Sequence, residues 1–106
     1  MEADSLPNSI EPMKASLAEI PSVSDGWATE IKWDGVRAIS FCEDGELRLQ
    51  GRRLNDITGL FPEIEPLGHQ AAAEGTVLDG EMVAFDEDGI PSFQRIQKRL
   101  RQDGER

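Results

Sequence analysis

The stretch "VRAISFCEDGELRLQGR", residues 36–52, decides the fold, because it predicts an antiparallel β-hairpin. Larger apolar side chains alternate with smaller or polar ones on both sides of a turn, at Ile39, Phe41, Leu47 and Leu49. A period of two is typical of strands, whose successive side chains point to opposite faces. Between the two runs stands Asp44-Gly45, a dipeptide that favours tight hairpin turns. We therefore expect two antiparallel strands here.

Two further segments are predicted to be strands, one before and one after the hairpin. In "WATEIKW", residues 27–33, and the aspartate that follows, strand geometry gathers three charged side chains on one face, those of Glu30, Lys32 and Asp34. In "TVLDGEMVAFD", residues 76–86, it places carboxylates among apolar side chains on one face, at Val77, Asp79, Glu81, Val83 and Phe85. A second Asp-Gly turn follows at residues 88 and 89.

Two helices complete the predicted architecture. The stretch "GLFPEIEPLGHQAA", residues 59–72, has helical spacing but also Pro62 and Pro66, so we expect a short, imperfect helix. Ser92 is a suitable N-cap for a helix over 93–101, with an apolar stripe of Phe93, Ile96 and Leu100 and a basic stripe of Arg95, Lys98 and Arg99. Because strands and helices do not alternate regularly, the sequence indicates an α+β fold with a largely antiparallel sheet and flanking short helices.

Length and composition indicate a soluble globular chain. Its 106 residues, 38% hydrophobic and 30% charged, suit one small domain or a piece of a larger one. Cys42 is the only cysteine, which excludes an intrachain disulfide and favours a cytoplasmic location. The start of the chain resembles no secretory signal, and no apolar run could cross a bilayer. Residues 1–10 are polar and predict a loose leader before a domain over 11–106.

The charge balance argues against strong nucleic-acid binding by this chain alone. Eleven basic and twenty-one acidic residues give a net charge of −10, whereas binding to a phosphate backbone requires cations. The deficit is uneven, since residues 92–106 hold five basic and two acidic residues. We therefore expect a poor DNA binder whose only basic stretch lies near its C-terminal end.

Lys32 raises a chemical question, because its side chain interrupts an otherwise apolar pattern. A lysine ammonium, with a pKa of about 10.4, is not a nucleophile unless burial or neighbouring cations keep it neutral. A half-buried strand beside Trp27 and Trp33 provides such burial. The alternative is a surface lysine paired with Glu30 or Asp34, since a short K-x-D-G pattern also recurs by chance.

Other residue types give weaker signals. Trp27 and Trp33 could stack on a base or pack in the core, and core packing is the simpler interpretation. His69, the only histidine, has no partner ligands nearby in the sequence, so no metal role is expected for it.

Three segments, in this order and with these separations, carry a family resemblance. They are "EIKWDGVRA" at 30–38, "GRRLNDIT" at 51–58 and "VLDGEMVAFD" at 77–86. Together they resemble motif I, a motif Ia-like segment and motif III of ATP-dependent DNA ligases, which share a superfamily with RNA ligases and mRNA capping enzymes. The bacterial ligase D type is most similar, also at Pro12-Met13 and "DGWATEIKWDGVRA", residues 25–38. The resemblance implies part of an ATP-grasp-like nucleotidyltransferase (adenylation) domain over residues 11–106.

This resemblance implies a reaction for Lys32. In the family, the lysine at this position attacks the α-phosphate of ATP, releases pyrophosphate and retains AMP as a phosphoramidate. AMP then passes to a DNA 5′-phosphate, and a 3′-hydroxyl displaces it to seal a nick during repair or recombination. ATP and Mg²⁺ or Mn²⁺ are the implied cofactors, and nicked duplex DNA is the implied partner.

The same resemblance implies further nucleotide contacts. Glu30 would face the adenine amino group, Ile31 would line the nucleotide site beside it, and Gly35 would let the backbone turn close to the nucleotide. Arg37 and Arg52 would contact the ribose and phosphate region. Glu81 would meet a ribose hydroxyl and help to place the metal, with Asp79 in a structural role. The alternatives are a Glu30–Lys32 ion pair, arginines that serve solubility, and a buried Arg37–Glu81 network.

The chain also departs from the family pattern. Gly51 stands where serine is more frequent, and Leu54 where a small or polar residue is more frequent, which puts contacts from that loop in doubt. The adenine-stacking aromatic, the second metal-binding glutamate, the two late lysines and the oligonucleotide-binding domain are not found in these 106 residues. We therefore expect the isolated chain to be weakly active or inactive. A catalytically dead remnant, an interaction module, and an RNA ligase or capping-type enzyme remain alternatives.

Overall fold

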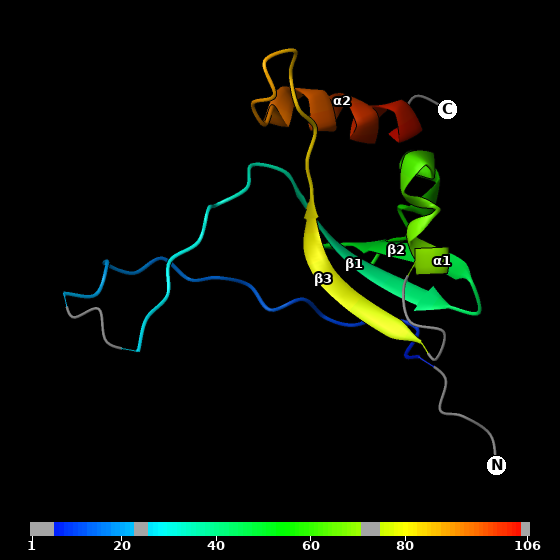
Figure 1. Cartoon of the computed structure of the whole chain (residues 1–106), viewed down its shortest axis with the longest axis horizontal. Helices are drawn as coiled ribbons and strands as arrows, with labels where there is room; N and C mark the ends of the chain where they lie inside the picture. Colours follow the sequence, from blue (N-terminus) through cyan, green and yellow to red (C-terminus); the bar gives the residue numbers. More distant parts are fainter. Residues whose placement is uncertain (1–5, 23–25, 71–74, 105–106) are drawn as a thin grey trace.

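Three strands form one antiparallel sheet in the order β2-β1-β3 (Figure 1). The computed structural model describes residues 6–22, 26–70 and 75–104. Strand β1 spans Val36–Glu43, β2 spans Glu46–Gly51 and β3 spans Thr76–Met82. Asp44 and Gly45 join β1 to β2 with φ values of 56° and 79°, the left-handed conformation that this type of turn requires. The predicted hairpin is therefore confirmed, and β1 is its central strand.

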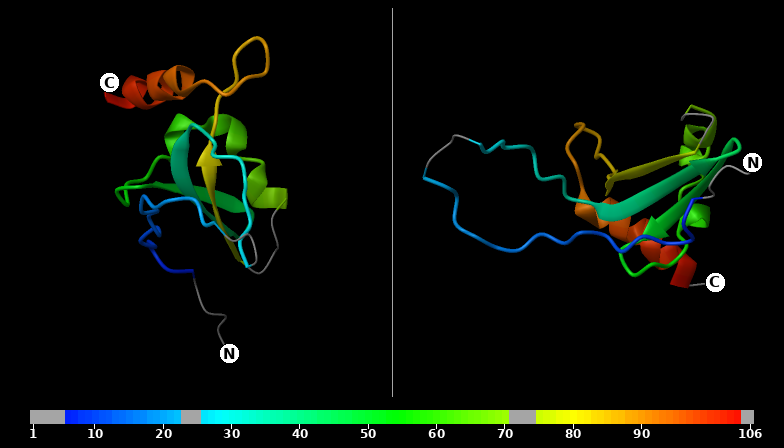
Figure 2. Two further views of the ribbon diagram at one scale, coloured as in Figure 1. Left: turned by 90° about the vertical axis from the view of Figure 1, so that its left-hand side faces the viewer. Right: turned by 90° about the horizontal axis from the view of Figure 1, so that it is seen from below.

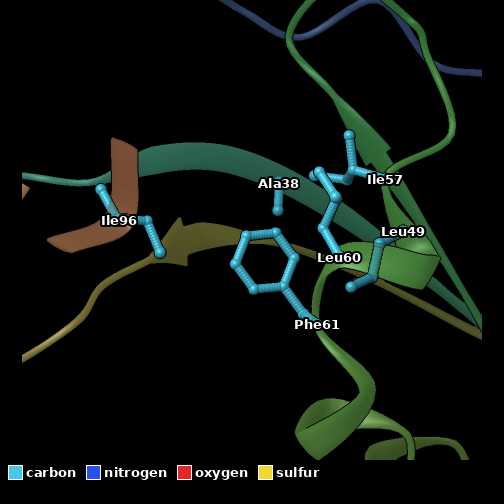
Figure 3. Close-up of a cluster of buried hydrophobic side chains, with 6 residues drawn as sticks. All are labelled: Ala38, Leu49, Ile57, Leu60, Phe61 and Ile96. Atoms are coloured by element: carbon cyan, nitrogen blue, oxygen red, sulfur yellow. The ribbon is translucent and has the colours of Figure 1, made fainter. Parts of the chain in front are cut away.

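One face of the sheet packs against the helices and forms the core. The buried cluster comprises Ala38, Leu49, Ile57, Leu60, Phe61 and Ile96. In Figure 3 the ring of Phe61 lies beneath β1, between Ile96 on one side and Leu60 with Leu49 on the other. Side chains of both strands of the hairpin and of the later helices thus share one apolar cluster, whose burial supplies the main favourable free energy of folding.

The predicted helix over 59–72 is replaced by shorter pieces. Two 3₁₀ turns, η1 at Thr58–Leu60 and η2 at Pro62–Ile64, precede the short helix α1 at Leu67–Gln70, and residues 71 and 72 lie outside the described residues. Pro62 begins η2, where its missing N–H costs nothing. Pro66 precedes α1, so each proline stands where a new piece begins.

Helix α2 spans Phe93–Gly104 and begins where predicted. The backbone N–H of Arg95 donates to Ser92 Oγ at 3.4 Å, which makes Ser92 the N-cap. Ile96 is buried, Leu100 is half-buried and Phe93 is partly exposed, so the apolar stripe faces the core only through its later residues. The α+β class with a largely antiparallel sheet is confirmed. None of the described helices has both the length and the apolar character that crossing a bilayer requires.

An N-terminal segment covers the other face of the sheet. Backbone groups of residues 6–10 bond to side chains of β1 and β2, namely Leu6 N–H to Glu43, both Ile10 N–H and C=O to Gln50, and the carbonyls of Pro7 and Asn8 to Arg48. The Arg48 guanidinium also lies 3.9 Å from the centre of the Phe41 ring. The described part of the predicted leader is therefore held against the sheet, while its residues 1–5 lie outside the described residues.

Residues 11–22 and 26–34 have no helix or strand and form an arm that extends away from the sheet (Figures 1 and 2). The predicted strand over 27–33 is wrong, because its backbone has no partner strand among the described residues and a period-two pattern does not form a strand without one. The arm exposes large apolar side chains, those of Met13, Leu17, Ile20, Trp27, Ile31 and Trp33. The radius of gyration is 16.3 Å, against about 13 Å expected for a compact domain of this length.

A tight turn after β2 carries a strained residue. The N–H of Gly51 donates to the carbonyl of Asn55 at 2.8 Å, and the N–H of Leu54 donates to the carbonyl of Gly51 at 3.0 Å. This geometry holds Leu54 at φ 67°, in the left-handed region. Leu54 is 48% exposed, so its side chain contributes little apolar burial. The left-handed conformation costs an ordinary L-residue about 1–2 kcal/mol and asparagine less.

We expect Leu54→Asn to stabilise the chain by about 0.5–1 kcal/mol, because strain is relieved and little apolar burial is lost. Urea unfolding followed by circular dichroism measures the change. Leu54→Ala is the matched control: it shortens the side chain but keeps the strain, so it should bring no gain. Equal stabilisation by both substitutions would show that the backbone conformation is not the cause.

Candidate functional site

The three segments that carry the family resemblance meet at one end of the sheet. Strand β1 begins at Val36, while β2 ends at Gly51 and β3 ends at Met82. The register pairs Ala38 with Gly51 and Val36 with Met82, so the start of β1 lies beside the ends of its two neighbours. Residues just before 36, just after 51 and close to 82 therefore project from the same end, which we call the motif end of the sheet.

Arg37 and Asp79 form an ion pair at the motif end. Arg37 Nε and Nη2 donate to the two Asp79 carboxylate oxygens at 2.6 Å each, a two-pronged ion pair. Arg37 Nη1 donates to the carbonyl of Met13 at 2.7 Å, which ties the start of the arm to the sheet. The hydrogen bonds with Asp79 raise the pKa of Arg37 and lower the pKa of Asp79.

Glu81 lies directly across from Arg37 in the β1–β3 register but is exposed. The considered alternative of a buried Arg37–Glu81 network is wrong, because Arg37 is bonded to Asp79 instead and neither carboxylate is buried. Asp79 thus has the structural role that the resemblance implied. Residues 6–22, 26–70 and 75–104 contain no group of three side chains that could hold a metal ion. Mg²⁺, however, is commonly held by one or two carboxylates together with substrate phosphates, and Glu81 suits that arrangement.

Lys32 lies on the exposed arm, four residues before β1. The expected shielding of its amine is wrong for this structure, since Lys32 is exposed together with its neighbours Glu30 and Ile31. Trp27 and Trp33 are 67% and 46% exposed, so the expectation that they pack in the core is also wrong. Within the described residues, Lys32 makes no ion pair with Glu30 or Asp34. The part of the chain that the structure describes therefore leaves the Lys32 side chain exposed to solvent.

Arg52 is exposed on the turn at 51–55, and hydrogen bonds between Leu49 and the residues that follow the turn hold it in position. Ile57 N–H donates to the carbonyl of Leu49 at 2.9 Å, and Leu49 N–H donates to Thr58 Oγ1 at 2.8 Å. The Asp56 carboxylate accepts from both the N–H and the hydroxyl of Thr58, which lowers the pKa of Asp56. The apolar and polar pattern of the sequence did not predict these Asp56–Thr58 hydrogen bonds, although aspartate side chains commonly bond to backbone N–H groups two residues later.

Gly35 lies where the arm enters β1 and approaches the end of β3. A β-carbon on Gly35 would overlap the backbone carbonyl of Met82 and lie 3.1 Å from a methyl carbon of Val83. The glycine is therefore required by the close approach of two backbones within this chain. This packing role is separate from the nucleotide contact that the resemblance implies for the same residue.

Comparisons with known proteins agree with the motif pattern. The family model described as "ATP dependent DNA ligase domain" matches residues 8–105. The multifunctional non-homologous end joining protein LigD of Mycolicibacterium smegmatis is 38% identical over 96 residues, and that of Pseudomonas aeruginosa is 41% identical over 92 residues. The SPbeta prophage-derived DNA ligase-like protein LigB of Bacillus subtilis is 33% identical over 91 residues.

A solved structure shows the same fold. The chain matches a mycobacterial DNA ligase D complexed with ATP and MES, with a TM-score of 0.61 and 38% identity over 66% of this chain and 23% of that chain. The alignments cover 90%, 87% and 86% of this chain for the three relatives above. They cover only 13% and 11% of the two LigD proteins and 33% of LigB, so the chain spans a small part of the length of its relatives.

We expect Gly35→Ala to destabilise the chain by about 3 kcal/mol or more, at the upper end of the cost of overpacking, because the new methyl group forces β1 and β3 apart. Gly80→Ala is the matched control within the same strand pair, since a β-carbon there has no neighbour within 4 Å. Thermal unfolding of the two variants should differ clearly. Similar melting temperatures would contradict the close approach at Gly35.

We expect stability to fall as the pH drops below the ordinary carboxylate range. The pKa of Asp79 is lowered in the folded chain, so its ion pair contributes fully above the ordinary aspartate pKa of about 3.9 and is lost as the pH falls through the lowered folded value. Because Asp79 is 55% exposed, the contribution is at most about 1 kcal/mol. Urea unfolding measures the loss of unfolding free energy between pH 7 and pH 3. This loss should be smaller in Asp79→Asn than in the unaltered chain, whereas in the control Asp88→Asn it should equal that of the unaltered chain.

Proposed function

Because the chain belongs to the family of ATP-dependent DNA ligase domains, we propose that it supplies the nucleotide-attacking part of a ligase adenylation domain, with Lys32 as the nucleophile. The observation that carries the proposal is the convergence of all three motif segments on one end of the sheet. The first residues of these segments are 21 to 47 positions apart in the chain, so only the β1–β2 and β1–β3 pairings bring them together.

The proposed chemistry is an in-line displacement on phosphorus. The neutral Lys32 amine attacks the α-phosphorus of ATP and an N–P bond forms. The bond to the bridging oxygen breaks, pyrophosphate leaves, and the nitrogen loses one proton to solvent. The lysyl-AMP then gives AMP to the 5′-phosphate of nicked duplex DNA, and the freed Lys32 can react again. Such a reaction depends mainly on positioning and on the neutralisation of developing charge. When bound, Mg²⁺ supplies part of that neutralisation at the leaving pyrophosphate.

Each residue that we propose to bind the nucleotide lies either next to Lys32 in the sequence or at the motif end of the sheet. Glu30 accepts from the adenine amino group, and Ile31 packs beside the base. Arg52, presented by its anchored turn, contacts the ribose and phosphate region. Glu81 binds a ribose hydroxyl and the metal. Arg37 contacts the same region of the nucleotide while Asp79 holds its guanidinium in orientation, so the nucleotide replaces the Met13 carbonyl rather than Asp79.

We propose that other parts of the ligase domain shield Lys32. A reactive amine requires burial, yet Lys32 is exposed here and its neighbours Trp27 and Ile31 are 67% and 70% exposed. The outer edge of β3 is also unpaired within the described residues, and Val77 and Leu78 are partly exposed along it. Exposed apolar side chains beside a free strand edge are typical of surfaces that another segment covers.

A non-catalytic role is the second candidate, and the exposure of Lys32 favours it for the chain on its own. In that case the arm serves as an interaction surface and the nucleotide ligands are not assembled. Sealing assays on nicked DNA and nicked RNA duplexes address the separate question of an RNA ligase or capping-type activity.

We expect little or no covalent label when the 106-residue chain is incubated with α-labelled ATP and Mg²⁺. Strong labelling should appear once the remaining ligase-domain segment of the Mycolicibacterium smegmatis LigD relative is joined to its C-terminal end. Lys32→Ala should abolish that label, whereas Lys14→Ala, which removes another exposed lysine of the arm, should retain it.

Two outcomes would contradict the proposal. A label that persists in Lys32→Ala would place the nucleophile elsewhere. A fused protein that folds, as judged by circular dichroism, but takes no label would favour the non-catalytic role.

A further inference from the structure

A buried polar side chain on β2 has no role in the nucleotide site proposed above. Gln50 is only 2% exposed. Its Oε1 accepts from the backbone N–H of Ile10 at 3.0 Å, and its Nε2 donates to the carbonyl of Ile10 at 2.7 Å. The two ends of one amide therefore bond to a residue that lies 40 positions earlier in the chain. Such a pair of bonds fixes Ile10 along the sheet, because sliding would leave buried polar groups unpaired.

Residues 6–13, which we call the clasp, lie across the face of the sheet opposite the helices. Ile39 and Phe41 of β1 point to this face, because they alternate with Ala38 of the core cluster. Each is 3% exposed, although neither belongs to that cluster. Pro12 in the clasp is buried as well. The clasp therefore combines apolar burial with its hydrogen bonds to the sheet.

The clasp ends on the guanidinium of Arg37. Arg37 Nη1 donates to the carbonyl of Met13 at 2.7 Å, whereas the Met13 side chain is 83% exposed. The contact thus depends on where the backbone lies and not on the side chain. In the function proposed above, the nucleotide takes the place of this carbonyl. The chain therefore supplies its own ligand to a cation that the nucleotide needs.

The clasp has little slack along the sheet. Leu6 and Met13 are seven positions apart, and an extended chain covers at most about 25 Å in seven steps. Their partners on β1, Glu43 and Arg37, are six positions apart, which is about 20 Å in a strand. Holding Ile10 in place therefore keeps the Met13 carbonyl, three residues later, close to Arg37.

We propose that Gln50 is a positioning residue of the nucleotide site, and that the clasp it holds competes with ATP for Arg37. The inference rests on the proposed function, because it takes Arg37 as a nucleotide ligand. A carbonyl that the chain itself holds beside Arg37 acts at a high effective concentration, and ATP must displace it. Loosening the clasp at Gln50 lowers that concentration and strengthens ATP binding. Because the competition acts on binding, it leaves the maximal rate of the chemical step unchanged.

Gln50→Leu in the fused protein described above tests this inference. Leucine fills the buried space without bonding to Ile10 and keeps the net charge. We expect the ATP dissociation constant to fall about tenfold, since two neutral hydrogen bonds correspond to roughly that factor. Isothermal titration calorimetry measures it in a Lys32→Ala background, where ATP binds without reacting. With Lys32 present, Gln50→Leu should lower the ATP concentration for half-maximal labelling but leave the maximal labelling rate unchanged.

Ser92→Ala is the matched control. It removes a neutral side-chain hydrogen bond from α2, also without changing the charge, and lies outside the clasp. The ATP dissociation constant should therefore stay the same in this variant, although the loss of the N-cap destabilises the chain.

Ile10→Pro cuts the same contact from the other side, because proline has no N–H to donate to Gln50. It should give the same gain in ATP affinity, and the double variant with Gln50→Leu should gain no more than either change alone. It also carries the test if Gln50→Leu does not fold, as judged by circular dichroism. Coupling between two sites is reciprocal, so ATP should in turn speed hydrogen exchange of the Ile10 amide in the fused protein with native Gln50.

An unchanged or weaker ATP affinity in the folded clasp variants would overturn the inference. An equal gain in Ser92→Ala, or exchange of the Ile10 amide that does not respond to ATP, would do the same. The Lys32-dependent label tests the proposed function separately. That label combined with unchanged affinity in Gln50→Leu would sink this inference alone, whereas a tenfold gain in affinity without the label would sink only the role of Lys32 as nucleophile.

Discussion

The antiparallel pairing of β1 with β3 is the constraint on which the rest of the structure depends. It joins residues about 40 positions apart, sets Glu81 across from Arg37 and places Asp79 within reach of the Arg37 guanidinium. Together with the β1–β2 pairing, it brings the ends of β2 and β3 to the start of β1. Long-range strand pairing has a high cost in chain entropy, and here the apolar cluster around Phe61 offsets that cost by docking the helices on one face.

The two faces of the sheet are stabilised in different ways. Helical pieces bury one face with apolar side chains, whereas residues 6–10 cover the other largely through hydrogen bonds to side chains such as Gln50 and Arg48. Arg37 extends this second set of contacts to Met13, where the arm begins. The sheet is therefore well supported, whereas Lys32 is exposed on the arm. The chemistry that we propose for Lys32 would require the arm to be covered rather than the sheet to be strengthened.

Local signals predicted the parts of the fold that local interactions stabilise. The Asp44-Gly45 hairpin and the Ser92 cap were predicted because turn and cap preferences act over a few residues. The strand predicted over 27–33 does not form, because its pattern describes a surface without identifying the partner that a strand requires. Sequence resemblance implied Arg37 as a candidate site residue, but its hydrogen bonds to Asp79 and Met13 depend on register and could not be read from spacing.

The sequence by itself determined the family, the chemical type of each proposed site residue and the hairpin at the centre of the sheet, because motif residues and short-range turn preferences are written directly in the chain. Only the tertiary structure decided which groups meet: Asp79 rather than Glu81 with Arg37, Gly35 against Met82, and Lys32 out in solvent. The physical reason is that such contacts arise from strand register and burial, which are properties of the whole packed chain rather than of any short segment.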